Sequence, residues 1–196
     1  MGKGDETRAA ILDRGLDLAS TVGLEGLTIG ALAKQAGMSK SGLYAHFDSK
    51  EGLQRAVLEH AAERFVAAVF VPAMAARRGL PRLRALFANW LEWDDHGTPG
   101  SCPFIGAAAE YDDRPGPVRE LLADQLRQLF AALSRAASLA VEEGEFAAEV
   151  DGAQFAYEFW GLILANHQFG RLIADAGEAR RRAERSFEAL IDRYCA

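Results

Sequence analysis

Residues 28–53 read TIGALAKQAGMSKSGLYAHFDSKEGL, and this stretch decides how the first part of the chain folds. Its apolar positions recur every three to four residues, which is the period of an amphipathic helix and not of a strand. Gly37 interrupts the pattern after about two turns of helix, and glycine readily takes the left-handed backbone that a tight turn between helices often needs. The stretch therefore predicts two short helices joined by a tight turn, with the proportions of a helix-turn-helix.

The second of these helices, expected from Ser39 to about His46, divides its residues between two faces. Leu43 and Phe47 are expected to pack inward, because a helix this short is not stable alone in water. The outward face carries mostly small and polar residues, namely Lys40, Ser41, Gly42, Tyr44 and Ala45. A glycine there costs the helix about 0.5–1 kcal/mol relative to alanine. Close approach of the backbone to a partner surface would account for it.

Three expected helix starts, near Thr28, Ser39 and Ser49, present free backbone N–H groups and the positive ends of helix dipoles. Such groups suit phosphates, and Lys50 adds a full positive charge beside the third start. Each start taken alone could be an ordinary capped turn at the surface. Together with the small polar face of the second helix, they predict contact with a DNA backbone.

The composition of the whole chain narrows the class of protein. Of the 196 residues, 49% are apolar and 26% are charged, and the formal net charge is −6. The first two values are ordinary for a globular protein. The net charge argues against a protein that coats nucleic acid non-specifically. It does not exclude a DNA reader, because residues 28–50 hold three lysines against a single acid.

No apolar run approaches the length of a membrane span, and the N-terminus has no signal-peptide pattern, so we expect a cytoplasmic protein without a membrane partner. Cys102 and Cys195 are expected to be free thiols, and their roles stay open.

The rest of the chain continues the helical period, so the expected fold class is all-α. Capping residues begin the segments, and glycine, proline and acidic clusters end them. The expected helices cover residues 5–20, capped by Asp5, then 28–37, 39–46, 49–70, 82–93, 103–110, 117–142, 152–175 and 178–194.

The stretch 28–53 closely resembles the DNA-binding domain of the TetR family of bacterial transcriptional regulators. The likeness covers roughly residues 5–55, including RAAIL at 8–12 and GLEGLT at 23–28. It implies an N-terminal three-helix, helix-turn-helix DNA-binding domain in residues 1–52. A larger helical ligand-binding and dimerisation domain would follow in residues 53–196.

The resemblance also implies DNA contacts at the matching positions. Lys40, Ser41 and Gly42 would lie at the major groove, with Lys40 the best placed for a guanine. Backbone phosphates would be held by the helix starts and flanking side chains, namely Thr28, Ser39, Tyr44, His46 and Lys50. For His46 a partly buried imidazole bonded within the domain is the alternative.

The helix expected at 152–175 is apolar on more than one side, and a helix with two apolar faces must be covered on both. A second subunit could cover one of them. The resemblance implies a homodimer in which this helix and the last helix of each subunit together form a four-helix interface. The residues expected there are Phe159, Phe169, Phe187, Leu190, Ile191 and Tyr194. A monomer that buries both faces internally is the alternative.

Aromatic residues gather between the expected helix breaks, and the resemblance implies that they line a pocket for a small, largely apolar ligand. The expected lining residues are Trp90, Trp93, Phe104, Tyr111, Phe130, Phe155 and Trp160. Core packing would explain any single one of them. His167 would be either a bonded core histidine or a polar group of the pocket.

Other clusters do not indicate chemistry. Glu92, Asp94, Asp95 and His96 have the composition of a solvated helix end, so we expect no metal site. Cys102 has no oriented base or oxyanion site, so no catalytic residue and no cofactor are expected.

The sequence therefore predicts a ligand-responsive transcriptional regulator, and most directly a repressor. It would bind a palindromic DNA operator as a homodimer and be released by its ligand. Three alternatives stay open: a helical small-molecule-binding or enzymatic protein without operator binding, a DNA-binding regulator without a ligand, and an activator.

Overall fold

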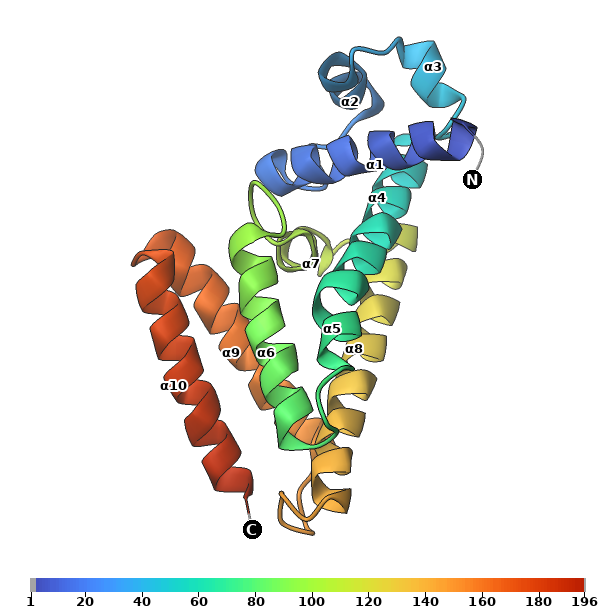
Figure 1. Cartoon of the computed structure of the whole chain (residues 1–196). Helices are drawn as coiled ribbons and strands as arrows, with labels where there is room; N and C mark the ends of the chain where they lie inside the picture. The colour runs from blue at the N-terminus through green and yellow to red at the C-terminus, as the bar shows by residue number, and fades with distance from the viewer. Residues whose placement is uncertain (1–2, 196) are drawn as a thin grey trace. The chain divides into compact units, whose positions relative to one another are not determined.

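The computed structural model of the chain describes residues 3–195, with side chains from residue 7 onward, and confirms the all-α prediction (Figure 1). The helices are α1 (Lys3–Val22), α2 (Ile29–Ala36), α3 (Lys40–Tyr44), α4 (Lys50–Phe65), α5 (Val71–Ala73), α6 (Leu80–His96), α7 (Pro103–Tyr111), α8 (Pro117–Glu142), α9 (Gly152–Leu172) and α10 (Ala176–Tyr194). A π-helical segment, η1 (Val66–Phe70), joins α4 to α5. Over the described part of the chain, no helix is both long enough and apolar enough to cross a membrane.

The chain forms two compact units that alternate along the sequence. The first unit contains Met1–Arg64 and Gly97–Gln125, and the second contains Phe65–His96 and Leu126–Ala196. This division follows backbone contacts and differs from the predicted functional boundary between residues 52 and 53. The assignment of DNA binding to residues 1–52 and of ligand binding and dimerisation to residues 53–196 stays a prediction.

The core of the first unit is built from leucines of α1–α4 and of the turn before α2. Fully buried leucines here are Leu16, Leu27, Leu32, Leu43, Leu53 and Leu58. Each such side chain contributes about 1.5–3 kcal/mol when it leaves water. Ala107 and Tyr111 of α7 belong to the same cluster. The short α3 is therefore held by its neighbours, and Leu43 and Phe47 lie in the core as predicted.

The predicted caps of α2, α3 and α4 are confirmed. The hydroxyl oxygens of Thr28, Ser39 and Ser49 each accept a hydrogen bond from the backbone N–H three residues later, over 3.1, 3.0 and 2.9 Å. Gly37 follows α2 with φ of 65°, the left-handed conformation that the turn requires. These contacts leave the other N–H groups of each first turn unused by the cap.

Two predicted boundaries at the start of the chain are wrong. Helix α1 begins at Lys3, so Asp5 lies inside the helix and is not its N-cap; its side chain is outside the described part. Helix α3 ends at Tyr44 and not at His46, because the chain turns there to reach the cap of α4.

The helical path that begins with α4 also continues beyond the predicted end at Phe70. Pro72 lacks an N–H and its ring crowds the carbonyl group four residues earlier. The wider π-helical turn of η1 precedes it and lets the chain carry on to Ala73. Asn89 of α6 donates from Nδ2 to the Val69 carbonyl oxygen over 3.0 Å, so the irregular turn is tied to a regular helix.

The second unit has an aromatic core between α6, α9 and α10. The rings of Phe87 and Phe187 stack with centroids 4.0 Å apart and an angle of 5° between their planes. The Phe159 ring meets both edge-on, at 5.2 and 5.6 Å. Pairs of this kind are worth about 0.5–1.5 kcal/mol beyond their area burial. This packing joins three helices that are distant in the sequence.

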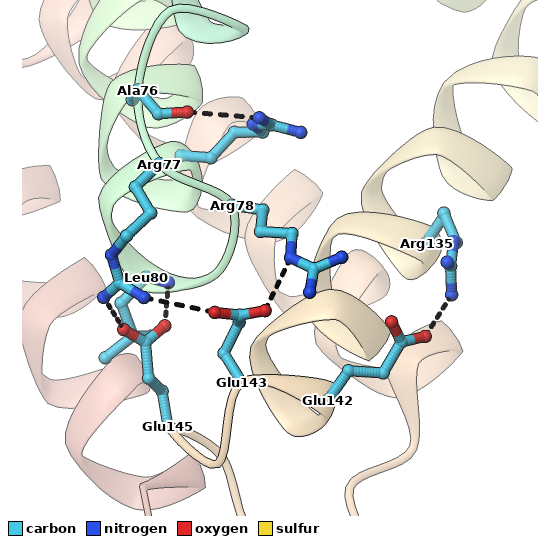
Figure 2. A network of polar contacts seen from close by, with 9 residues as sticks. Ala76, Arg77, Arg78, Leu80, Arg135, Glu142, Glu143 and Glu145 are labelled. Carbon is cyan, nitrogen blue, oxygen red and sulfur yellow. Dashed lines mark hydrogen bonds and ion pairs between the residues drawn. The ribbon is translucent and has the colours of Figure 1, made fainter.

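An ionic cluster lies at the start of α6 in the same unit (Figure 2). Arg77 pairs with Glu145, and Arg78 pairs with Glu143 over 2.5 Å. Glu145 Oε2 also accepts a hydrogen bond from the Leu80 backbone N–H over 2.6 Å. That carboxylate lies at the N-terminus of α6, where the helix dipole favours a negative charge. The cluster ties the turn before α6 to the connection between α8 and α9.

Replacing Phe159 by alanine should lower the free energy of unfolding by about 3–5 kcal/mol, because a fully buried ring is lost and a cavity is left. Urea denaturation followed by circular dichroism measures the loss. Gln128 of α8 is exposed in the same unit, and Gln128→Ala should stay within about 0.5 kcal/mol of the unchanged protein. Similar losses for the two variants would contradict the packing described.

Candidate functional site

The residues predicted to contact DNA lie on α3 and at the starts of α2 and α4, all within the first unit. The exposed ones are Thr28, Ser39, Lys40, Ser41 and Tyr44, whereas Gly42, His46 and Lys50 are half-buried. Tyr44 is 54% exposed, while Leu43 beside it is fully buried. The helix thus separates a core face from a polar face, as the sequence predicted.

Gly42 has a reason for being glycine inside the chain itself. A Cβ at this position would lie 3.2 Å from Ser39 Oγ, the atom that caps α3. That oxygen also lies 3.1 Å from Ser41 Oγ. The absent side chain therefore leaves room for the cap, and it also lets a partner surface approach the helix closely.

Lys40 lies against the first turn of α2. A Cβ at Gly30 would be 3.3 Å from Lys40 Cε and 3.6 Å from Nζ, so the lysine stem crosses this glycine. Its ammonium group is therefore close to the N-terminus of a helix capped by Thr28. A helix N-terminus and an ammonium group side by side suit a phosphate.

Lys50 is held by an acid. Its Nζ donates to Glu25 Oε1 over 2.7 Å. The other carboxylate oxygen, Oε2, accepts from the Tyr111 hydroxyl over 2.9 Å and lies 3.5 Å from Arg114. Hydrogen bonds from Lys50 and then Tyr111 lower the pKa of the Glu25 carboxyl. Burial is the main cause that raises the pKa of the Tyr111 hydroxyl, and the hydrogen bond to Glu25 raises it further.

A second acid, Glu110 of α7, binds the turn between α1 and α2. Glu110 accepts hydrogen bonds from the backbone N–H groups of Leu24 and Glu25, over 3.2 and 2.6 Å. No pattern in the sequence pointed to Glu25 or Glu110, and Arg114 was expected only as a solvated residue of the turn after α7. The bonded positions are about 85 residues apart, and no periodicity or spacing connects them.

The structure does not gather the eight predicted ligand-binding residues in one unit. Phe104 packs against the core of the first unit, and Tyr111 belongs to that core. The other six, Trp90, Trp93, Phe130, Phe155, Trp160 and His167, lie in the second unit. Their role in ligand binding stays a prediction.

Within the second unit, several of these rings pack on one another. Trp90 lies 4.8 Å from Phe65 and 5.6 Å from Trp160 between ring centroids, and Phe130 lies 6.3 Å from Trp160. Phe155 is fully buried. The buried Trp90 Nε1 finds no acceptor among the residues that the structure describes. A buried donor of this kind costs about 1–3 kcal/mol.

His167 is a bonded histidine. Its Nδ1 lies 2.6 Å from Asp94 Oδ1, and Asn166 donates from Nδ2 to Asp94 Oδ2 over 2.9 Å. The Asp94 side chain is only 5% exposed, so its predicted place on a solvated helix end is wrong. Across the described residues, no group of three or more histidine, cysteine, aspartate or glutamate residues is placed to hold a metal ion.

The residues predicted for a dimer interface are mostly buried in their own unit. At most 2% of the surface of each of Phe159, Phe187, Leu190 and Ile191 is exposed, whereas Phe169 and Tyr194 are half-buried. The first four have little surface to offer a second subunit. Large apolar side chains that are exposed on or just after α9 are Tyr157, Leu172 and Ile173. The interface itself stays a prediction.

Comparison with protein families accounts for most of the chain. Residues 11–57 match the bacterial regulatory proteins of the tetR family, and residues 79–187 match the tetracyclin repressor-like C-terminal domain. The chain belongs to the TetR family. The resemblance found in the sequence is thereby confirmed, and the protein is a DNA-binding transcriptional regulator with an N-terminal helix-turn-helix. Members of this family are not enzymes. A search of curated proteins finds no match.

Solved structures share the TetR fold over nearly the whole chain. A TetR regulator from Chloroflexus aurantiacus has a TM-score of 0.81 at 24% identity, with 98% of this chain and 96% of that chain covered. One from Cytophaga hutchinsonii has a TM-score of 0.85 at 18% identity, with 100% and 98% covered. AibR, solved with isovaleryl coenzyme A and operator DNA, has a TM-score of 0.70 at 24% identity, with 90% and 96% covered.

Replacing Lys50 by alanine should weaken binding to a random-sequence duplex and make its salt dependence less steep, by about one per subunit in log–log slope, if Lys50 neutralises a phosphate. Fluorescence anisotropy at several salt concentrations gives the slope. Arg119→Ala removes the same charge at an exposed position of α8 and should leave the slope unchanged. An unchanged slope for Lys50→Ala would remove this residue from the interface.

Tyr111→Phe deletes only the hydroxyl that donates to Glu25, and should lower the free energy of unfolding by about 1 kcal/mol. Tyr157→Phe is the matched control, because that tyrosine is 66% exposed. Urea denaturation compares the two. If both variants unfold at the same urea concentration, the hydrogen bond from Tyr111 to Glu25 does not contribute to stability.

Proposed function

We propose that this TetR-family regulator is a homodimeric, ligand-responsive repressor that acts on DNA in the cytoplasm. Residues 28–50 would bind a palindromic operator, and a small molecule bound in residues 53–196 would release it. The observation that carries the DNA-binding role is the exposed polar face of α3, flanked by the capped N-termini of α2 and α4.

The proposed contacts divide into positioning and reading. Helix starts and side chains at Thr28, Ser39, Tyr44, His46 and Lys50 would hold phosphates, which position the protein without reading sequence. Lys40, Ser41 and Gly42 would lie in the major groove. With so few side chains that reach base edges, most of the binding free energy would come from the backbone contacts.

Support for a ligand comes from relatives. AibR was solved with isovaleryl coenzyme A and operator DNA together, and another structural neighbour is the ketosteroid transcriptional regulator of Mycobacterium tuberculosis. Both are under 25% identical to this chain, so the ligand of this chain is not taken from them. The expected pocket residues of this chain are mostly aromatic, which would suit a largely apolar compound.

Release requires a difference in affinity. A ligand shifts the regulator only if it binds the DNA-free shape more tightly than the DNA-bound one. The helical path from Lys50 to Ala73 is the chain segment that would carry the signal, because it begins at a predicted phosphate contact and passes into the residues of the second unit.

A regulator without a ligand is the second candidate. The mutual packing of Trp90, Trp160 and Phe130 favours it, since rings that fill a core leave no pocket between them. An effect of candidate compounds on tryptophan fluorescence would count against this candidate.

Selection of bound duplexes from a random pool should return an inverted repeat whose half-sites are about one helical turn, roughly 34–36 Å, apart. Its affinity should exceed that for random DNA by about 10³-fold or more. Lys40→Ala should reduce this preference, and Tyr44→Ala should weaken binding to operator and random DNA alike, while the circular dichroism spectrum of each variant stays unchanged. Weak binding that falls steeply with salt and shows no preferred sequence would contradict the operator proposal.

The selected operator then tests the ligand. Isovaleryl coenzyme A is a first probe, titrated with and without operator DNA. Equal affinity of an effective compound in the two titrations would exclude ligand-driven release. A reporter gene placed behind the operator distinguishes repression from activation.

A further inference from the structure

A small cavity lies in the second unit, between the end of α6 and the α9–α10 hairpin. Its volume is about 150 Å³, equal to roughly five water molecules at about 30 Å³ each. The residues that line it are Asp94, Asp95, Asn166, His167, Gly170, Arg171, Ala176 and Ala179. Most of these side chains are polar, unlike the aromatic residues that the sequence suggested for ligand binding.

One part of the lining is already fixed by internal hydrogen bonds. Both oxygens of the buried Asp94 carboxylate accept a hydrogen bond, one from Asn166 Nδ2 and one in its contact with His167 Nδ1. These contacts hold the Asn166 amide in one orientation. Turning the amide over would bring its oxygen against the carboxylate, and two acceptors would then face each other.

The same amide has an unused acceptor. Asn166 is 6% exposed, and its Oδ1 has no hydrogen-bond donor within the described part of the chain. Buried amide oxygens in folded proteins nearly always have a donor. Asn166 is one of the residues that line the cavity, so the missing donor would have to come from a molecule bound there.

The neighbouring groups favour a donor as well. The Asp95 carboxylate is 16% exposed and has Arg180 3.3 Å from its Oδ2. Burial raises the pKa of this carboxyl, and the positive charge of Arg180 partly offsets that effect. Gly170, Ala176 and Ala179 form a wall without large side chains, and Arg171 completes the lining. A Cβ at Gly170 would lie 3.1 Å from the Ala179 Cβ, so α9 and α10 pack closely beside the cavity.

We propose that this cavity binds a small molecule, or the end of a larger one, through an N–H donor that bonds to Asn166 Oδ1 beside Asp95. The donor is a primary amide or a primary ammonium group. The regulatory role of such a ligand rests on the proposed function, whereas its binding to the free protein does not depend on that function.

The test uses the full-length ¹⁵N-labelled protein without DNA, so that its result is independent of operator binding. Acetamide and methylammonium are the two probes, and acetone and tetramethylammonium are matched molecules without an N–H donor. Saturable shifts are expected for the backbone amides of Gly170 and Ala176 and for the Asn166 side-chain amide. For probes this small the dissociation constant should be millimolar.

A response to acetamide alone assigns the site to neutral amides, and a response to methylammonium alone assigns it to amines. Either supports the proposal. Equal responses to a probe and its N–H-free partner, or no saturable response to either probe, would overturn it, and Asn166 would then be satisfied by water.

Two variants locate the binding. Asn166→Leu keeps a side chain of similar size without the acceptor, and Ala176→Leu places bulk at the exposed edge of the cavity. Each should weaken the probe by 10-fold or more, whereas Gln168→Ala, exposed on α9 and outside the lining, should not. If Asn166→Leu loses its native circular dichroism spectrum, Ala176→Leu alone tests the site. Unchanged probe binding in Ala176→Leu would show that the probe binds outside this cavity.

Discussion

Helix α3 has five residues, and a helix of that length has no stability of its own in water. Everything that this protein can do on DNA depends on how that constraint is met. Leu43 is fully buried and Phe47 nearly so, in a core built from α1, α2, α4 and α7. The cap at Ser39 satisfies one orphan N–H group, and the short helix thereby presents its polar face without having to be stable alone. The reading surface is thus a consequence of core packing beneath it.

The same unit shows how an acidic protein offers a favourable surface to phosphates. The attraction is local: three capped helix N-termini and three lysines lie within residues 28–50, while most acids lie elsewhere. Glu25 is an acid that nevertheless lies close to Lys50. Its carboxylate accepts hydrogen bonds from Lys50 and from the Tyr111 hydroxyl. A lysine positioned by an acid loses less side-chain freedom on binding than a free one, but its charge must be shared. The contact with Glu25 therefore fixes the position of Lys50 and weakens the attraction of Lys50 for phosphate.

The second unit separates two kinds of interior. Around Phe159 the rings of α6, α9 and α10 fill space and stabilise the fold. Near the α9–α10 hairpin the interior is polar. Both carboxylate oxygens of Asp94 have hydrogen-bond partners, whereas the Asn166 amide has a partner for its nitrogen but not for its oxygen. Because polar groups in a dry interior need partners, an incomplete network marks a place where another molecule can bind. An aromatic composition is a weaker signal, since core packing uses the same residues.

The amino-acid sequence alone determined the class of fold, the caps at Thr28, Ser39 and Ser49, the turn at Gly37 and the family, because periodicity, capping and turn chemistry act between residues close together in the chain. It also predicted α8 at 117–142, where no proline or glycine interrupts the helix. The end of α4 at Phe70 was mistaken, since sequence shows that Pro72 disrupts a helix but not that a π-helical turn can absorb it. Only the tertiary structure decided the partners of Lys50, the burial of Asp94, the interior positions of Phe187 and Leu190, and the cavity beside Asn166. Those features depend on contacts between residues from about 25 to more than 80 positions apart, and such contacts leave no local pattern to read.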